Sequence, residues 1–194
     1  MRNRVIAATA LLLASQTAFA ESRGGHVDIY YVPSADFEID IPGFGSGSDD
    51  GDGFGFKGLI PADNLAITAG YQSVGYDESG IDFDQLRIGV GMVGPTTSGV
   101  FVEYIDADLA DAPADGFGIQ GRLAGEQFYA QVGYVTLDDD SEKIAGPEFL
   151  FGIAIGGDES VGGFIDLRKT MLEGDESNVE YEFTDVRIGL RIKF

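Results

Sequence analysis

The chain has 194 residues and a formal net charge of −21, with 29 glycines, one histidine, no cysteine and no tryptophan. This length corresponds to one domain, and a hydrophobic content of 44% excludes a disordered chain. The excess of acid excludes a nucleic-acid partner, because phosphate binding needs clustered Lys and Arg. The absence of cysteine excludes disulfides, thiolate metal sites and thiol nucleophiles.

Residues 1–20 have the pattern of a secretory signal peptide. Arg2 and Arg4 precede the apolar run 5–14, and Ala18 and Ala20 are small residues at both positions of a cleavage site. The run is about half of the ~20 apolar residues that a membrane-spanning helix needs. We therefore expect residues 1–20 to be removed and residues 21–194 to form the mature domain.

The mature sequence alternates apolar with polar residues, which is the signature of β-strands. In the last segment Ile188, Leu190 and Ile192 share one face, while Arg187 and Arg191 lie on the other. We predict ten strands, at 26–41, 52–60, 64–76, 81–93, 98–108, 116–124, 127–137, 147–156, 160–171 and 179–194.

Pro33 interrupts the first predicted strand. We expect a single strand that is bulged or bent at Pro33, because proline within a sheet is confined to such positions. The alternation is read as continuous through it, with Ile29, Tyr31, Phe37 and Ile39 all facing outward.

Alternation by itself fits either a soluble sandwich or a membrane barrel. The connections favour a barrel, because the first, third, fifth, seventh and ninth are read as acidic and mostly long, and the others as short turns. Loops sorted in this way are typical of an even-stranded outer-membrane barrel with both termini in the periplasm. Tyr71, Tyr104 and Tyr134 each precede an acidic segment, which predicts an aromatic girdle at one membrane interface.

The ending Arg187-x-Gly189-x-x-Ile192-x-Phe194 resembles the assembly signal of outer-membrane proteins, in which the terminal aromatic matters most. With the other features, the chain resembles the OmpA-like, OmpX-like and opacity-type porin-like group of small outer-membrane barrels. The resemblance implies an all-β, antiparallel up-and-down transmembrane barrel in a Gram-negative outer membrane. It also implies contact with lipid and lipopolysaccharide, recognition by the barrel assembly machinery and a monomeric state. Eight strands, the number typical of that group, are the alternative to ten.

The same alternation places most of the basic residues of the mature chain in the barrel lumen. Charged groups in a low-dielectric interior must be paired, which predicts an internal network. The residues predicted for this network are Asp28, Lys57, Arg87, Glu103, Arg122, Asp166, Arg168, Arg187 and Arg191.

Two interpretations of the lumen follow. In the first, the charges neutralise one another, the lumen is closed and the barrel is a rigid platform for its loops. In the second, inward glycines leave a narrow watery path that favours small anions. The glycines invoked are Gly89, Gly91, Gly118, Gly133 and Gly152.

The sequence favours neither catalysis nor a dedicated metal site. His26 is the only imidazole and opens the first strand at the predicted periplasmic rim, where a catalytic base is not expected. The segment 48–53 resembles half of a calcium loop but lacks the closing acid, so we expect no cofactor beyond weak Ca²⁺ or Mg²⁺ binding by the acidic loops. The function expected is a non-enzymatic outer-membrane barrel that presents acidic surface loops. A narrow porin-like channel is the alternative, followed by a soluble periplasmic β-protein.

Overall fold

The computed structural model describes residues 24–94, 97–110, 112–139, 141–156 and 160–194. The predicted signal peptide, 1–20, lies outside the described residues. Among the residues described, no helix is long and apolar enough to cross a membrane. The structure is an all-β closed barrel of ten strands: β1 (His26–Ile41), β2 (Gly45–Ala62), β3 (Leu65–Tyr76), β4 (Asp82–Val93), β5 (Gly99–Leu109), β6 (Ala112–Ala124), β7 (Phe128–Asp138), β8 (Lys143–Ile155), β9 (Val161–Gly174) and β10 (Glu180–Lys193).

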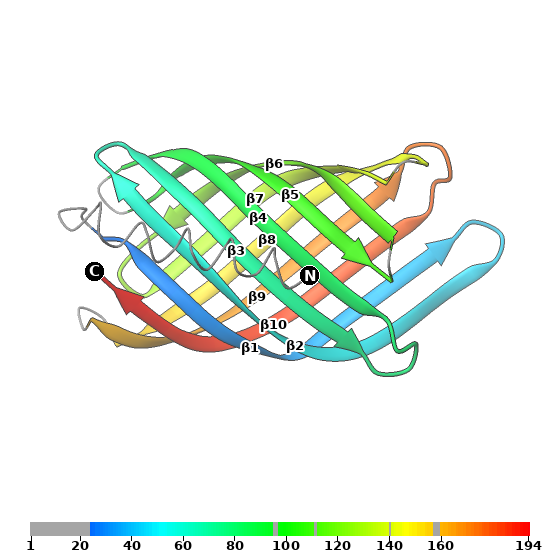
Figure 1. Ribbon diagram of the computed structural model, residues 1–194, viewed down its shortest axis with the longest axis horizontal. Coiled ribbons are helices and arrows are strands. Elements are labelled where there is room, and N and C mark those ends of the chain that lie inside the picture. Colours follow the sequence, from blue (N-terminus) through cyan, green and yellow to red (C-terminus); the bar gives the residue numbers. More distant parts are fainter. Residues whose placement is uncertain (1–23, 95–96, 111, 140, 157–159) are drawn as a thin grey trace.

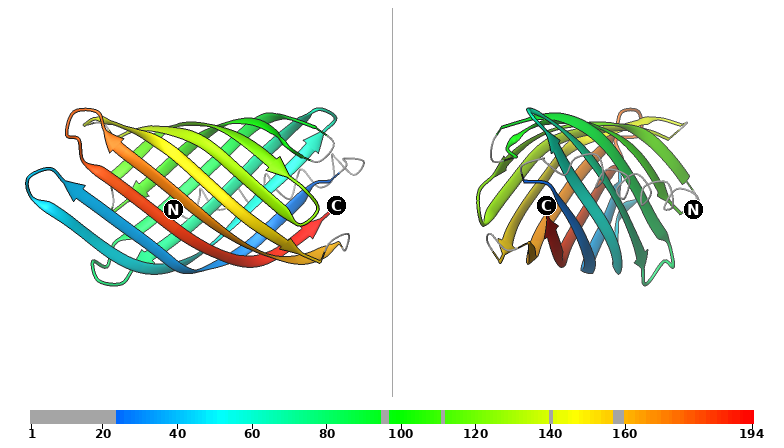
Figure 2. Two further views of the ribbon diagram at one scale, coloured as in Figure 1. Left: turned by 180° about the vertical axis from the view of Figure 1, so that it is seen from behind. Right: turned by 60° about the vertical axis from the view of Figure 1, so that its left-hand side comes forward.

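Every strand pairs antiparallel with its neighbours in the chain, and β1 closes the barrel by pairing with both β2 and β10 (Figures 1 and 2). Closure leaves no strand edge without a partner. The prediction of an up-and-down barrel is therefore confirmed, with ten strands rather than the alternative eight.

The predicted sorting of long and short connections is wrong. The first, third, fifth, seventh and ninth connections cover only 42–44, 77–81, 110–111, 139–142 and 175–179, no longer as a group than the other four. The strands instead continue through the acidic segments, because a ladder of backbone hydrogen bonds forms whatever the polarity of the side chains. The β1–β2 hairpin is the clearest case and projects beyond its neighbours at one end of the barrel (Figure 1).

A β-bulge in β1 is present at Pro33, as predicted. The register with β10 steps from Tyr31 opposite Ile188 to Ser34 opposite Val186, so β1 contains one extra residue. The continuous outward face predicted through Pro33 is wrong, since an extra residue exchanges the two faces. Beyond the bulge Phe37 points inward and stacks on the ring of Phe183 at 5.0 Å.

The interior has three layers along the barrel axis. We call the end that holds His26 and Lys193 the terminal end, and the end that holds the β1–β2 turn the loop end. A small apolar cluster of Leu59, Ala66, Val93 and Phe101 lies towards the terminal end. A larger cluster fills the loop end, and its buried members include Tyr76, Phe83, Ile105, Leu137, Leu172 and Phe183. Charged side chains lie between the two clusters.

Candidate functional site

Charged side chains, most of them buried, gather in the middle of the barrel in a set that we call the charged layer, and ion pairs join all but one of them. Its six basic members come from β2, β4, β6, β9 and β10, and its five carboxylates come from β1, β5, β8, β9 and β10. The members are Lys57, Arg87, Arg122, Arg168, Arg187 and Arg191 with Asp28, Glu103, Glu148, Asp166 and Asp185. Eight of the nine residues that the sequence predicted for a lumen network are ion-paired in this layer, and the ninth, Arg122, is buried beside them without an ion pair in the described part of the chain.

Asp166 on β9 is the most connected carboxylate of the layer. It accepts hydrogen bonds from Lys57 Nζ at 2.6 Å, Arg187 Nε at 2.6 Å and the Tyr129 hydroxyl at 2.7 Å. Asp28 accepts two bonds of 2.8 Å from Arg191. The Asp28–Arg191 and Asp166–Arg187 pairs join directly opposed residues of neighbouring strands, whereas Lys57 on β2 and Tyr129 on β7 reach Asp166 from strands that are not next to β9.

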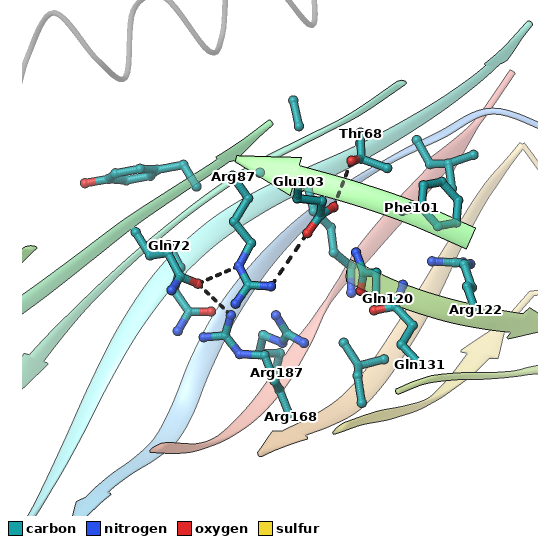
Figure 3. Close-up of a pocket in the computed structure, with 18 of the residues that line it drawn as sticks. Thr68, Gln72, Arg87, Phe101, Glu103, Gln120, Arg122, Gln131, Arg168 and Arg187 are labelled. Carbon is teal, nitrogen blue, oxygen red and sulfur yellow. Dashed lines mark hydrogen bonds and ion pairs between the residues drawn. The ribbon is translucent and has the colours of Figure 1, made fainter. Parts of the chain in front are cut away.

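Two members of the layer, Glu148 and Asp185, are absent from the predicted network. Glu148 receives two hydrogen bonds from Arg87, and Asp185 receives two from Arg168. Strand alternation could have identified both, because Glu148 shares its face with the inward Gly152, and Asp185 shares its face with Arg187. Arg87 also lies 3.6 Å from Glu103, the partner expected for the lumen arginines (Figure 3).

The inward glycines do not leave open space beside them. A Cβ at Gly152 would overlap the ring of Tyr129, one at Gly91 the ring of Phe101, and one at Gly89 the side chain of Glu103. Each glycine thus makes room for a large side chain of a neighbouring strand. Gly118 and Gly133 are likewise contacted, by Ile105 and by Gln120. The argument for a watery path from these glycines is therefore wrong.

Small cavities lie in the interior, and two of them share Gln85, Arg87 and Arg168 in their lining. One, of about 90 Å³, lies at the charged layer and is lined by Arg122, Gln120 and Gln131 among others (Figure 3). The other, of about 140 Å³, lies in the loop-end cluster among Leu109, Leu137 and other residues. Each is comparable to the space of a few water molecules, at roughly 30 Å³ per water.

The outer face of the barrel carries an apolar band around its middle. Its exposed members include Ile29, Val90, Val100, Ile119, Val132, Phe151, Ile165 and Leu190. Each strand contributes side chains to this band, so it encircles the barrel. A continuous apolar surface of this kind is far larger than the patches that monomeric soluble proteins expose.

The three tyrosines predicted for a girdle lie on the outer face towards the loop end of the band. Tyr104 and Tyr134 are 39% and 52% exposed, whereas Tyr71 is only 9% exposed because it packs beside Phe56. Tyr71 donates a hydrogen bond of 2.6 Å to Asp84. The ring therefore lies in the apolar band while the hydroxyl reaches the acidic residues above it.

Acidic residues replace the apolar ones on the outer face beyond the tyrosines. Asp84 pairs with Asp108 across β4 and β5, and Asp115 pairs with Asp106 on one side and Asp138 on the other. Inside the barrel at the same height lies the apolar loop-end cluster. The two faces of the wall thus exchange their polarity along the strands: apolar outside and charged inside at the middle, but acidic outside and apolar inside at the loop end.

Several acidic residues of the loop end are bound to backbone amides. Asp49 accepts hydrogen bonds from the amides of Glu78 and Ser79. Glu142, in the β7–β8 connection, accepts bonds from the Ser177 hydroxyl at 2.6 Å and the Ser177 amide at 3.0 Å, which tie two connections together. These bonds lower the pKa of the Glu142 carboxyl. Within the described ranges no group of three or more acidic or histidine side chains is arranged to hold a metal ion.

The predicted assembly-signal residues occupy different environments on β10. Arg187 is buried in the charged layer, and Gly189 faces Tyr30 so closely that a Cβ would overlap its backbone. Ile192 and Phe194 are each 40% exposed, and the Phe194 amide donates to the Gly25 carbonyl at 3.1 Å. His26 is 6% exposed and lines the smaller cavity.

No protein-family model and no curated protein matches the chain. Among solved structures, Neisserial surface protein A is similar at 15% identity, with 88% of this chain and 97% of that chain covered and a TM-score of 0.44. Ail, the attachment invasion locus protein of Yersinia pestis, is similar at 13% identity, with 88% and 99% covered and a TM-score of 0.36. The outer membrane protein AlkL is similar at 14% identity, with 89% and 90% covered and a TM-score of 0.39.

These TM-scores are all below 0.5, and the barrel is established by the closed strand order described above. The chain is a small single-chain β-barrel. That is the fold implied by the resemblance to the OmpA-like, OmpX-like and opacity-type group.

Proposed function

We propose that this protein is a closed, non-enzymatic barrel of the bacterial outer membrane that presents an acidic hairpin at the cell surface. The observation that carries the proposal is the exchange of polarity along the strands. A barrel surrounded by water would bury apolar side chains along its whole length. An apolar exterior with a charged interior at the middle, followed by the reverse at the loop end, fits a wall that passes from lipid into water.

The outer membrane is the membrane that fits this architecture. Single-chain barrels with an even number of antiparallel strands are characteristic of it, and both termini then lie at the periplasmic end. The predicted signal peptide and the ending Arg187, Gly189, Ile192 and Phe194 support export and recognition by the barrel assembly machinery. Lipopolysaccharide and phospholipid would be the neighbours of the apolar band, around a monomeric barrel.

A closed lumen is supported by the way the interior is filled. The charged layer spans the barrel with mutual ion pairs, and the loop-end cluster stacks Phe37, Phe183 and Phe83 in sequence at 5.0 and 5.1 Å. The two cavities are small, and the side chains of Arg87 and Arg168, which line both, are held by ion pairs with Glu148 and Asp185. A solute would have to displace both layers to pass.

The projecting β1–β2 hairpin is the part that we propose to act at the surface. Its tip carries Phe44, which is 91% exposed, beside Ile41, which is 38% exposed. Asp36, Asp40 and Asp50 are exposed on the strands below. This surface suits a partner that offers positive charge around an apolar patch.

The first test concerns topology and uses two tagged variants. An epitope inserted between Gly43 and Phe44 should be reached by antibody on intact cells. The same epitope between Asp63 and Asn64, at the terminal end, should be reached only after the outer membrane is permeabilised. Equal labelling of both sites on intact cells, or of neither, would contradict the proposed orientation.

The second test concerns the closed lumen. Refolded protein in a planar bilayer should give no discrete conductance steps, once insertion is established by the heat-dependent gel shift of folded barrels. Discrete, reproducible steps would instead support the narrow porin-like channel. Ion selectivity would then be compared between the wild type and Arg87→Gln.

A further inference from the structure

The charged layer contains six basic side chains and five carboxylates, so its charges do not cancel. Five of the basic residues have a carboxylate within 4.0 Å: Lys57, Arg87, Arg168, Arg187 and Arg191. Arg122 on β6 is the exception: it makes no ion pair and donates no side-chain hydrogen bond to any residue in the described part of the chain. The whole residue is only 6% exposed, and its Nε is buried without an acceptor.

The surroundings of Arg122 leave its charge uncompensated. Its guanidinium lies over the ring of Tyr129 at 5.2 Å, and Arg191 packs over the same ring at 4.7 Å. The carboxylate of Asp28 is held by both hydrogen bonds from Arg191, and Asp166 is held by Lys57 and Arg187. A buried charge without a partner is costly, so a counter-ion at this position would stabilise the fold.

Arg122 lines a cavity of about 90 Å³, together with Gln120 two residues before it on β6 and Gln131, its direct cross-strand partner on β7 (Figure 3). Two carboxylates, Glu103 and Glu148, line the same cavity, and both are paired with Arg87. The two glutamine amides offer further N–H donors. Phe101 closes part of the same cavity with an apolar ring.

We propose that Arg122, Gln120 and Gln131 form a binding site for one small monovalent anion inside the barrel, such as a halide, nitrate or formate. The single surplus positive charge matches a single negative charge. The volume admits a small ion with one or two water molecules at roughly 30 Å³ each. Water alone would fill the space without balancing the charge.

The experiment titrates the protein in detergent micelles with sodium formate at constant ionic strength, the balance being made up with a bulky organic anion. The arginine Nε–H signals are followed by NMR, and Arg122 is assigned from its loss in Arg122→Gln. We expect a saturable shift of the Arg122 signal in the wild type. Bromide in place of formate should give the same saturable shift. In crystals that contain bromide, an anomalous peak should lie beside the Arg122 guanidinium.

Three variants separate the site from general charge effects. In Arg122→Gln the formate concentration that gives half-maximal thermal stabilisation should rise about tenfold or more, since a charged hydrogen-bonding partner is lost. Lys169→Gln removes the same charge from the outer face and should bind as the wild type does. Gln131→Glu keeps Arg122 but gives it an internal carboxylate, so it should abolish formate binding while the barrel remains folded.

A wild-type Arg122 signal that does not saturate would overturn the proposal. So would Gln131→Glu that folds and still binds formate, or Arg122→Gln that responds to formate as the wild type does. The site does not depend on the proposed surface role, because binding is read in micelles. Loss of antibody access or the appearance of conductance would leave this result unchanged.

Discussion

The middle and the loop end of this barrel use the same strands in opposite ways. At the middle, Asp166 and Arg187 are paired inside while Ile165 and Ile188 are exposed outside. At the loop end, Phe83 and Phe183 are packed inside while acidic residues such as Asp84 line the outer face. In both regions the side chains alternate with period two between the inner and the outer face. The two regions differ only in which face holds the apolar side chains and which holds the charged ones.

The comparison teaches that the surrounding medium decides which set lies outside. Lipid favours an apolar exterior, and the interior of the middle layer then holds charges that must find partners. Water favours an acidic exterior, and the loop end can then be filled by aromatic packing as in a soluble protein.

The largest loss of stability should follow the removal of one carboxylate from the middle region. Asp166→Ala leaves the donors of Lys57, Arg187 and Tyr129 without their acceptor. We expect a loss of about 3–5 kcal/mol in the free energy of unfolding, because breaking a buried ion pair leaves an uncompensated charge. Urea unfolding in micelles measures it.

The control is Glu182→Gln on the outer face. Its ion pair with Lys169 is part-exposed, with side chains 33% and 41% accessible, so we expect a loss of only about 0–1 kcal/mol. Equal losses in the two variants would mean that the charged layer is no more interdependent than a surface pair.

The loop end should respond to the loss of a ring rather than a charge. Phe183 lies between Phe37 and Phe83, so Phe183→Ala opens a cavity in the loop-end cluster. We expect a cost of about 3 kcal/mol, within the range for truncating a buried phenylalanine. Phe44→Ala at the exposed hairpin tip should stay within about 0.5 kcal/mol of the wild type. A negligible cost for Phe183→Ala would contradict a soluble-like core at this end.

The smallest effect concerns the connections above the loop end. Hydrogen bonds from the Ser177 hydroxyl and amide hold the pKa of Glu142 below its usual value of 4.5. A carboxyl whose pKa is lowered by folding stabilises the folded state above its unfolded pKa. This contribution is present at neutral pH and should be lost as the pH falls from 4.5 through the lower folded-state pKa.

Carboxyl NMR titration of Glu142 checks this prediction. Ser177→Ala removes the hydrogen bond from the Ser177 hydroxyl, so the pKa of Glu142 should rise towards 4.5. If the titration curve of Glu142 is unchanged in Ser177→Ala, the Ser177 hydroxyl is not the cause of the lowered pKa. Asp139 provides an internal reference, since its pKa is lowered by a different donor set, the Ser141 hydroxyl and the Glu142 amide.

Much of the architecture was predictable from the sequence. Alternation identified all ten strands and placed Lys57, Arg87 and Asp166 on inward faces, because a side chain's face is fixed by its position in the strand. At the loop end β2, β6 and β8 begin earlier than predicted and β9 ends later, because the ladder continues through acidic residues that are typical of loops. The bulge at Pro33 follows from the sequence, but its reversal of the faces of β1 does not.

Local periodicity is enough to predict ten alternating strands with charges on one face of their middle portions. Which charges meet depends on closure of the barrel, because Asp166 on β9 reaches Lys57 on β2 only when the sheet has closed on itself. Closure also decided that Tyr129 fills the space over Gly152 and that Arg122 is left without a carboxylate. Such outcomes depend on distances across the barrel, which local periodicity does not contain.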